Sequence, residues 1–68
     1  MSSEELKKLQ AYFRRLFGNE TIFVKARPQK DDSAEVYIGE EFIGLLFKDD
    51  EDEDLSYNFT MAILDFDL

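Results

Sequence analysis

One helical pattern is followed only by strand patterns, and this order limits the fold more than any other feature of the sequence. Apolar residues near the start recur at spacings that place them on one side of a helix. They are Leu6, Leu9, Phe13, Leu16 and Phe17. Ser2 followed by Glu5 matches a capping box, and Gly18-Asn19 is a typical helix end. The sequence therefore predicts one N-terminal amphipathic helix with a single apolar stripe.

The rest of the chain predicts four strands, because short segments alternate between apolar and polar residues. These segments span 21–27, 34–38, 42–48 and 56–64. Their short connections favour antiparallel neighbours in chain order. We therefore expect an α+β fold in two layers, with the helix packed on a four-stranded antiparallel meander sheet. A chain of 68 residues has no room for a second core, so residues 1–68 form a single α-β-β-β-β domain.

Turn length decides which residues of the second and third strands share a face. A two-residue turn at Gly39-Glu40 or Glu40-Glu41 keeps Val36 and Ile43 together, whereas a three-residue loop would reverse one strand. We favour the two-residue turn. The expected core face of the sheet is then Ile22, Val24, Ala26, Val36, Ile38, Ile43, Leu45, Phe47, Tyr57, Phe59, Met61 and Ile63.

The opposite face of the sheet is predicted to carry large apolar residues that no second helix covers. The candidate interface residues there are Phe23, Tyr37, Phe42, Leu46 and Ala62. Four of them, Phe23, Tyr37, Phe42 and Ala62, are expected to form one row across the strands. Exposed aromatic rings on a sheet suggest a partner, and we expect a homodimer through this face. The alternatives are that the rings pack on one another or under the Pro28 loop in a monomer, or that they meet a different protein or a ligand.

Charge narrows the choice of partners. Eight Lys and Arg against sixteen Asp and Glu give a net charge of -8. Nucleic-acid binding needs cations to neutralise phosphates, so neither DNA nor RNA is expected, and anionic membranes are disfavoured for the same reason. Sheet aromatics beside Lys25, Arg27 and Lys48 would suit single-stranded nucleic acid, but the net charge opposes that use. A basic protein partner is allowed.

Six consecutive carboxylates follow the third strand segment: Asp49, Asp50, Glu51, Asp52, Glu53 and Asp54. Asp50, Asp52 and Asp54 match the first ligand positions of an EF-hand loop, but Leu55 and Met61 replace the turn glycine and the bidentate glutamate. The simplest interpretation is a solvated loop that keeps the protein soluble. Weak divalent-cation binding and docking of a basic protein are the alternatives.

Several kinds of chemistry are excluded by composition. The chain has no Cys and no His, so it lacks thiolate nucleophiles, imidazole bases and zinc–sulfur sites. We expect neither enzymatic activity nor a cofactor. No apolar run approaches the roughly 20 residues of a membrane span, and the N-terminus does not resemble a secretory signal. A cytoplasmic location is expected.

The whole chain resembles a family of short, uncharacterised proteobacterial proteins catalogued as a domain of unknown function. The resemblance implies a bacterial cytoplasmic protein and brings no activity, cofactor or functional residue with it. The residues that carry it are Glu4 to Tyr12, Ala26-Arg27-Pro28, Lys30 to Gly39, Glu41 to Gly44, Asp49 to Asp52 and Leu55 to Phe59.

From these observations we expect a small non-enzymatic interaction module that associates with itself through the aromatic second face of its sheet. The alternative is an acidic adaptor or decoy that binds a basic protein, or weakly a divalent cation, through residues 49–54.

Overall fold

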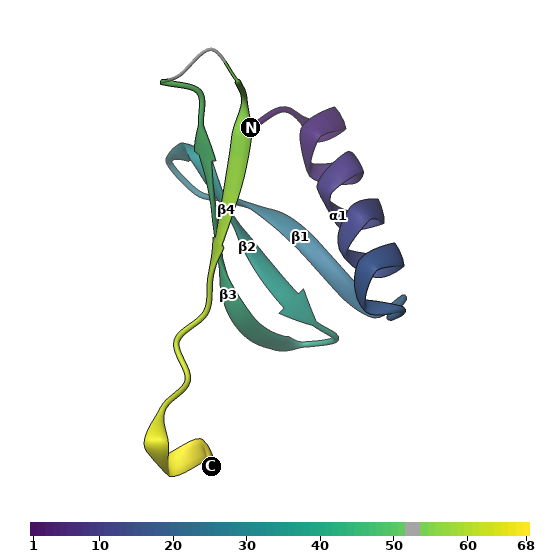
Figure 1. The fold of residues 1–68 in the computed structure, drawn as a ribbon, viewed down its shortest axis with the longest axis vertical. Helices are drawn as coiled ribbons and strands as arrows, with labels where there is room; N and C mark the ends of the chain where they lie inside the picture. The colour runs from purple at the N-terminus through teal and green to yellow at the C-terminus, as the bar shows by residue number, and fades with distance from the viewer. Residues whose placement is uncertain (52–53) are drawn as a thin grey trace.

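The predicted two-layer α+β architecture is confirmed. The computed structural model describes residues 1–51 and 54–68. The strands follow the order β1-β2-β3-β4, each antiparallel to the next, and the helix lies against one face of the sheet (Figure 1). The elements are α1 (Ser3–Phe17), β1 (Ile22–Arg27), β2 (Lys30–Ile38), β3 (Glu41–Asp49), β4 (Ser56–Thr60) and the 3-10 turn η1 (Asp65–Asp67).

Both ends of α1 are capped as the sequence predicts. The Ser2 hydroxyl accepts a hydrogen bond from the Glu5 backbone N–H at 3.1 Å, and the Glu5 carboxylate accepts one from the Ser2 N–H at 3.0 Å. This capping box satisfies two backbone donors that helix geometry leaves unpaired. Gly18 ends the helix in the left-handed conformation, with φ 62°, which glycine adopts without steric cost.

The turns between strands are short. Gly39-Glu40 forms the expected two-residue connection, and β3 begins at Glu41. Between β1 and β2 the connection is tighter than expected, because β2 begins at Lys30 and not at residue 34. Pro28 fixes its own φ, and Gln29 takes a positive φ of 61°, so these two residues reverse the chain without the polar loop that the sequence suggested.

A β-bulge in β3 changes which residues point toward the helix. Tyr37 pairs with Phe42, but Val36 pairs with Gly44, which leaves Ile43 as an extra residue. One extra residue shifts the alternation of everything after it. The prediction that placed Leu45 and Phe47 in the core and Leu46 outside it was therefore wrong: Leu46 is 1% exposed and lies in the core cluster.

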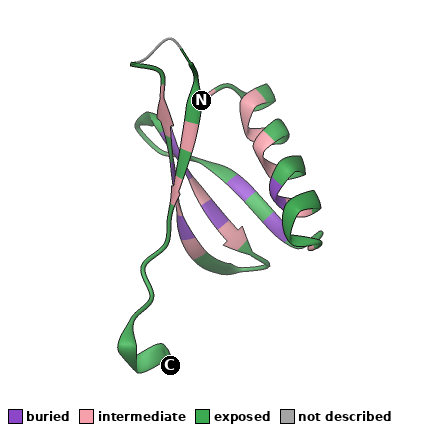
Figure 2. Cartoon of the chain, viewed as in Figure 1, coloured by how far each residue is buried: buried purple, intermediate pink, exposed green. Residues whose placement is uncertain are grey.

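The core is smaller than the predicted face. It lies between α1 and the centre of the sheet (Figure 2) and consists of Phe13, Ile22, Val24, Ala34, Val36 and Leu46. The helix packs mainly along β1. Leu16 and Phe17, expected in the core, are each 58% exposed, and Ala26 and Ile38 are also exposed.

The fourth strand is shorter than predicted. It ends at Thr60, opposite Leu45, and the chain then leaves the sheet (Figure 1). The bulge at Ile43 bends β3 where further residues would have to pair. Met61 and Ile63 are therefore exposed and do not join the core, contrary to the prediction.

Candidate interaction surface

Three aromatic side chains form a row across the face of the sheet that α1 does not cover. Phe23 of β1 pairs with Tyr37 of β2, and Tyr37 pairs with Phe42 of β3. The Tyr37 and Phe42 rings meet edge to face, with centroids 5.7 Å apart. Phe42 is 51% exposed and Phe23 is 37% exposed, although the Arg14 guanidinium lies 5.1 Å from the Phe23 ring centroid. The predicted row is therefore formed, and its rings remain in contact with water.

A polar pair borders this row. Lys25 and Glu35 are directly opposite each other, as the alternation predicts. The Lys25 ammonium lies 4.6 Å from the Tyr37 ring centroid, and the Tyr37 hydroxyl donates a hydrogen bond to Glu35 at 3.1 Å. That hydrogen bond raises the pKa of Tyr37 above its ordinary value. One positive and one negative group therefore flank the aromatic row.

The bulge enlarges the apolar part of this face. Leu46, proposed as an interface residue, lies on the helix side and cannot take part. In exchange, Leu45 and Phe47 lie on the same side as Phe42, and Phe47 is 40% exposed. We call the resulting set the uncovered face: Phe23, Tyr37, Phe42, Leu45 and Phe47.

Ala62 is not part of a strand, so the predicted four-residue row does not extend into β4. It nevertheless lies beside the start of β3. With Phe42, Leu45 and Thr60 it lines an open hollow of about 350 Å³ at the edge of the uncovered face.

A polar cluster that the sequence did not reveal ties the start of α1 to the sheet. The Glu5 carboxylate accepts a hydrogen bond from the Tyr57 hydroxyl at 2.7 Å and pairs with the Lys48 ammonium at 2.9 Å. The hydrogen bonds from Tyr57, Ser2 and Lys48 lower the pKa of Glu5 to about 2. Lys48 was expected on the other face; the bulge brings it to the helix side. No acid or base in this cluster titrates near neutrality, so we interpret it as a structural clamp.

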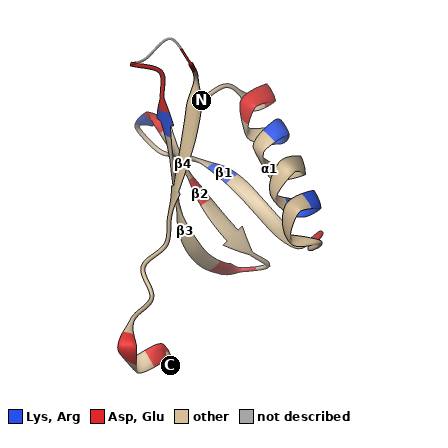
Figure 3. Cartoon of the chain, viewed as in Figure 1, with Lys and Arg blue, Asp and Glu red and all other residues tan. Residues whose placement is uncertain are grey.

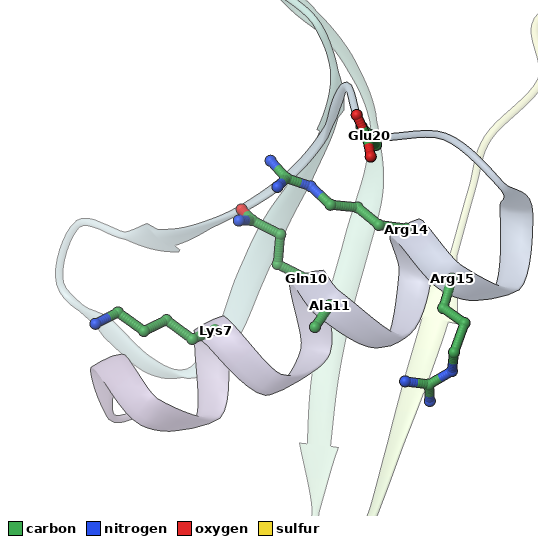
Figure 4. A pocket seen from close by; sticks show the side chains of 6 residues that line it. All are labelled: Lys7, Gln10, Ala11, Arg14, Arg15 and Glu20. Carbon is green, nitrogen blue, oxygen red and sulfur yellow. The ribbon is translucent and has the colours of Figure 1, made fainter.

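Side chains of α1 also cover the outer edge of β1. Gln10 and Arg14 point from the helix toward this strand, whereas Arg15 points away from it (Figure 4). The Gln10 side-chain oxygen accepts a hydrogen bond from the Val24 N–H at 3.1 Å, and Arg14 Nε donates one to the Ile22 carbonyl at 2.8 Å. These bonds occupy backbone groups that would otherwise be open to another strand.

The described residues of the acidic run lie at one end of the molecule (Figure 3). Asp50, Glu51 and Asp54 are exposed, and Asp49 is partly buried and accepts a hydrogen bond from the Glu51 N–H at 3.3 Å. Asp52 and Glu53 lie outside the described residues, so the predicted Asp50, Asp52 and Asp54 set is not tested. In residues 1–51 and 54–68 no group of three or more potential ligands is arranged to hold a metal ion.

Comparison with other proteins gives a family but no function. A family model described as "Protein of unknown function (DUF3126)" matches residues 5–67. No curated protein and no solved structure showed significant similarity to the chain. Neither helix in the described part of the chain has the length and apolar character needed to cross a membrane.

Proposed function

Because this chain belongs to DUF3126, a family of unknown function, we propose a function from its own surfaces: it is a non-enzymatic interaction module that pairs with a second copy of itself through the uncovered face. The observation that carries the proposal is the bulge at Ile43, which reverses the face to which the following residues of β3 point. It adds Leu45 and Phe47 to Phe23, Tyr37 and Phe42, so that apolar side chains extend over three strands. A contiguous apolar patch of this kind is typical of a protein interface.

The Lys25–Glu35 pair beside the uncovered face suits a second copy as the partner. Two chains that each carry -8 repel one another through most of their surfaces. The uncovered face is an exception, because its five residues carry no charge and the Lys25–Glu35 pair beside them has no net charge. In a two-fold symmetric pair the same patch meets itself, so a Lys–Glu pair can face its counterpart with opposite charges matched.

Replacing Phe42 with Asp tests the proposal. Phe42 is half exposed, so the substitution spares the core but places two carboxylates in the apolar interface of a dimer. We expect sedimentation velocity to show loss of the association made by this face, with at least a tenfold rise in its dissociation constant. Leu55→Asp is the matched control, since Leu55 is equally exposed but lies outside the uncovered face. An unchanged association in Phe42→Asp would rule out this interface.

An adaptor that binds a basic protein through residues 49–54 is the second candidate. Its support is the exposure of Asp50, Glu51 and Asp54 at one end of the molecule. Binding of polylysine, followed by calorimetry, should weaken steeply with added salt and with Asp50→Asn plus Glu51→Gln, but not with Phe42→Asp. Equal binding by the neutralised chain would exclude this function.

A further inference from the structure

A second apolar surface lies on the helix side of the sheet, apart from the uncovered face. A groove of about 550 Å³ separates the last turns of α1 from β4. Its main lining residues are Leu9, Tyr12, Phe13, Leu16, Phe17 and Phe59. The Phe13 ring forms its floor. It is stacked on the Phe17 ring with centroids 5.8 Å apart, and it meets the Phe59 ring edge-on with centroids 5.4 Å apart. Leu16 and Phe17 form its open side and are 58% exposed, which is unfavourable unless another apolar group covers them.

The segment 61–68 carries apolar residues that are mostly exposed. Ile63 is 66% exposed, Phe66 is 84% exposed and Leu68 is 92% exposed. Apolar and acidic residues alternate at the end of this segment, where Asp65 and Asp67 flank Phe66. The family model extends to residue 67, so the segment is part of the family's domain.

Geometry separates this segment from the groove of its own chain. Glu5 contacts Tyr57 and Phe13 contacts Phe59, so α1 and β4 run in the same direction. After Phe13 the helix continues for four residues, about 6 Å at 1.5 Å per residue. An extended chain covers that distance in about two residues, so Ile63 and the residues after it lie past the end of the helix, as Figure 1 shows.

Charge also matches between the segment and the rim of the groove. The Arg15 guanidinium, in the last turn of α1, lies 5.6 Å from the ring centroid of Tyr12, which lines the groove. In a chain with twice as many acidic as basic residues, an apolar groove with Arg15 beside it favours an acidic apolar segment.

We propose that two copies exchange these segments: residues 61–68 of each chain dock in the groove of the other, with the Phe66 ring against Leu16 and Phe17 and with Asp65 and Asp67 near Arg15. The contact is reciprocal and therefore closes as a pair. The groove lies on the helix side of the sheet and contains no residue of the uncovered face, and the docking ring is that of Phe66; Ala62, Leu64 and Asp67 of the segment line the hollow beside Phe42. A chain that has both interfaces forms assemblies of four or more copies.

The test is made on the full chain with Phe42→Asp, which removes the uncovered face from the association. Sedimentation velocity should still show a dimer, and adding Phe66→Ser should raise its dissociation constant at least tenfold. Leu55→Ser is the matched control, because Leu55 is exposed but belongs to neither surface. A monomeric Phe42→Asp chain would overturn the exchange and leave the proposed function standing. If Phe42→Asp instead associates as strongly as the wild type, and adding Phe66→Ser abolishes that association, the exchange stands and the proposed function is overturned.

Charge reversal and isotope-filtered NMR locate the contact. Arg15→Glu should weaken the dimer, and Asp65→Lys with Asp67→Lys in the same chain should restore it, since each chain supplies both sides. In a mixture of labelled and unlabelled chains, cross-peaks between Phe66 and Phe17 must join different molecules. Cross-peaks confined to one molecule would mean that the segment folds onto its own groove, and the exchange would be rejected.

Discussion

At the scale of single residues, the Glu5 carboxylate connects three elements. It caps α1 and binds Tyr57 of β4 and Lys48 of β3. Its pKa is lowered from 4.5 to about 2, which means that folding favours the charged form. The resulting stabilisation is fully present above pH 4.5 and is lost as the pH falls toward 2.

Removing the Tyr57 hydroxyl should therefore have a pH-dependent effect. We expect Tyr57→Phe to lower the free energy of unfolding by about 1 kcal/mol at pH 7, the usual contribution of one hydrogen bond. The difference from the wild type should shrink between pH 4.5 and pH 2, as Glu5 becomes protonated in both chains. Urea denaturation at several pH values measures this, and a difference that stays constant down to pH 2 would contradict the clamp.

Gly44 is required for close packing. A Cβ atom at this position would lie 2.5 Å from the Thr60 carbonyl oxygen and 2.7 Å from the Phe59 ring. Gly44→Ala should therefore destabilise the fold by about 1–3 kcal/mol, as overpacking does in other cores. Asn58→Ala, a change of an exposed residue in the same pair of strands, serves as control in thermal denaturation. An unchanged melting temperature in Gly44→Ala would show that Phe59 does not need this space.

At the scale of elements, α1 both covers the sheet and caps its first edge. Gln10→Ala should leave the Val24 N–H without its partner, reduce stability by about 1 kcal/mol and open the edge of β1. Hydrogen exchange should accelerate most at Val24. Lys7→Ala is the control, because Lys7 is an exposed residue of the same helix. Equal exchange at Val24 in both variants would mean that Gln10 does not protect the edge.

The helix and the strand order could be predicted from sequence because their signals are local. The capping box, the apolar stripe and the two-residue turn at Gly39-Glu40 each depend on neighbouring residues. The bulge has no such signal. Leu45, Leu46 and Phe47 are all apolar, so the sequence fits either phase of alternation, and only the pairing with β2 decides between them.

The same ambiguity affected the prediction of the interface residues. The row of Phe23, Tyr37 and Phe42 precedes the bulge along β3 and was placed correctly. Leu46 and Lys48 follow it and were placed on the wrong face. The end of β4 was missed for a related reason, because alternation continues to Leu64 while the partner strand bends away.

At the scale of the whole molecule, the net charge of -8 opposes self-association. Salt shortens the range of this repulsion, from about 30 Å at 0.01 M to about 10 Å at 0.1 M. We therefore expect the wild-type association constant to increase with sodium chloride concentration in equilibrium sedimentation. Leu55→Asp should show the same trend. An association that weakens with salt would indicate that ion pairs, and not apolar contacts, hold the copies together.

The two borders of the sheet differ in one respect that bears on its behaviour at high concentration. Helix side chains bond to the backbone of β1, while in the described residues no side chain bonds to the backbone of β4. A sheet with one unpaired edge strand can pair there with one neighbouring sheet. The outer edges of the pair are then the strands that bond to helix side chains. If two β4 margins paired, both outer margins would be β1 strands, whose Ile22 carbonyl and Val24 N–H are already bonded to helix side chains.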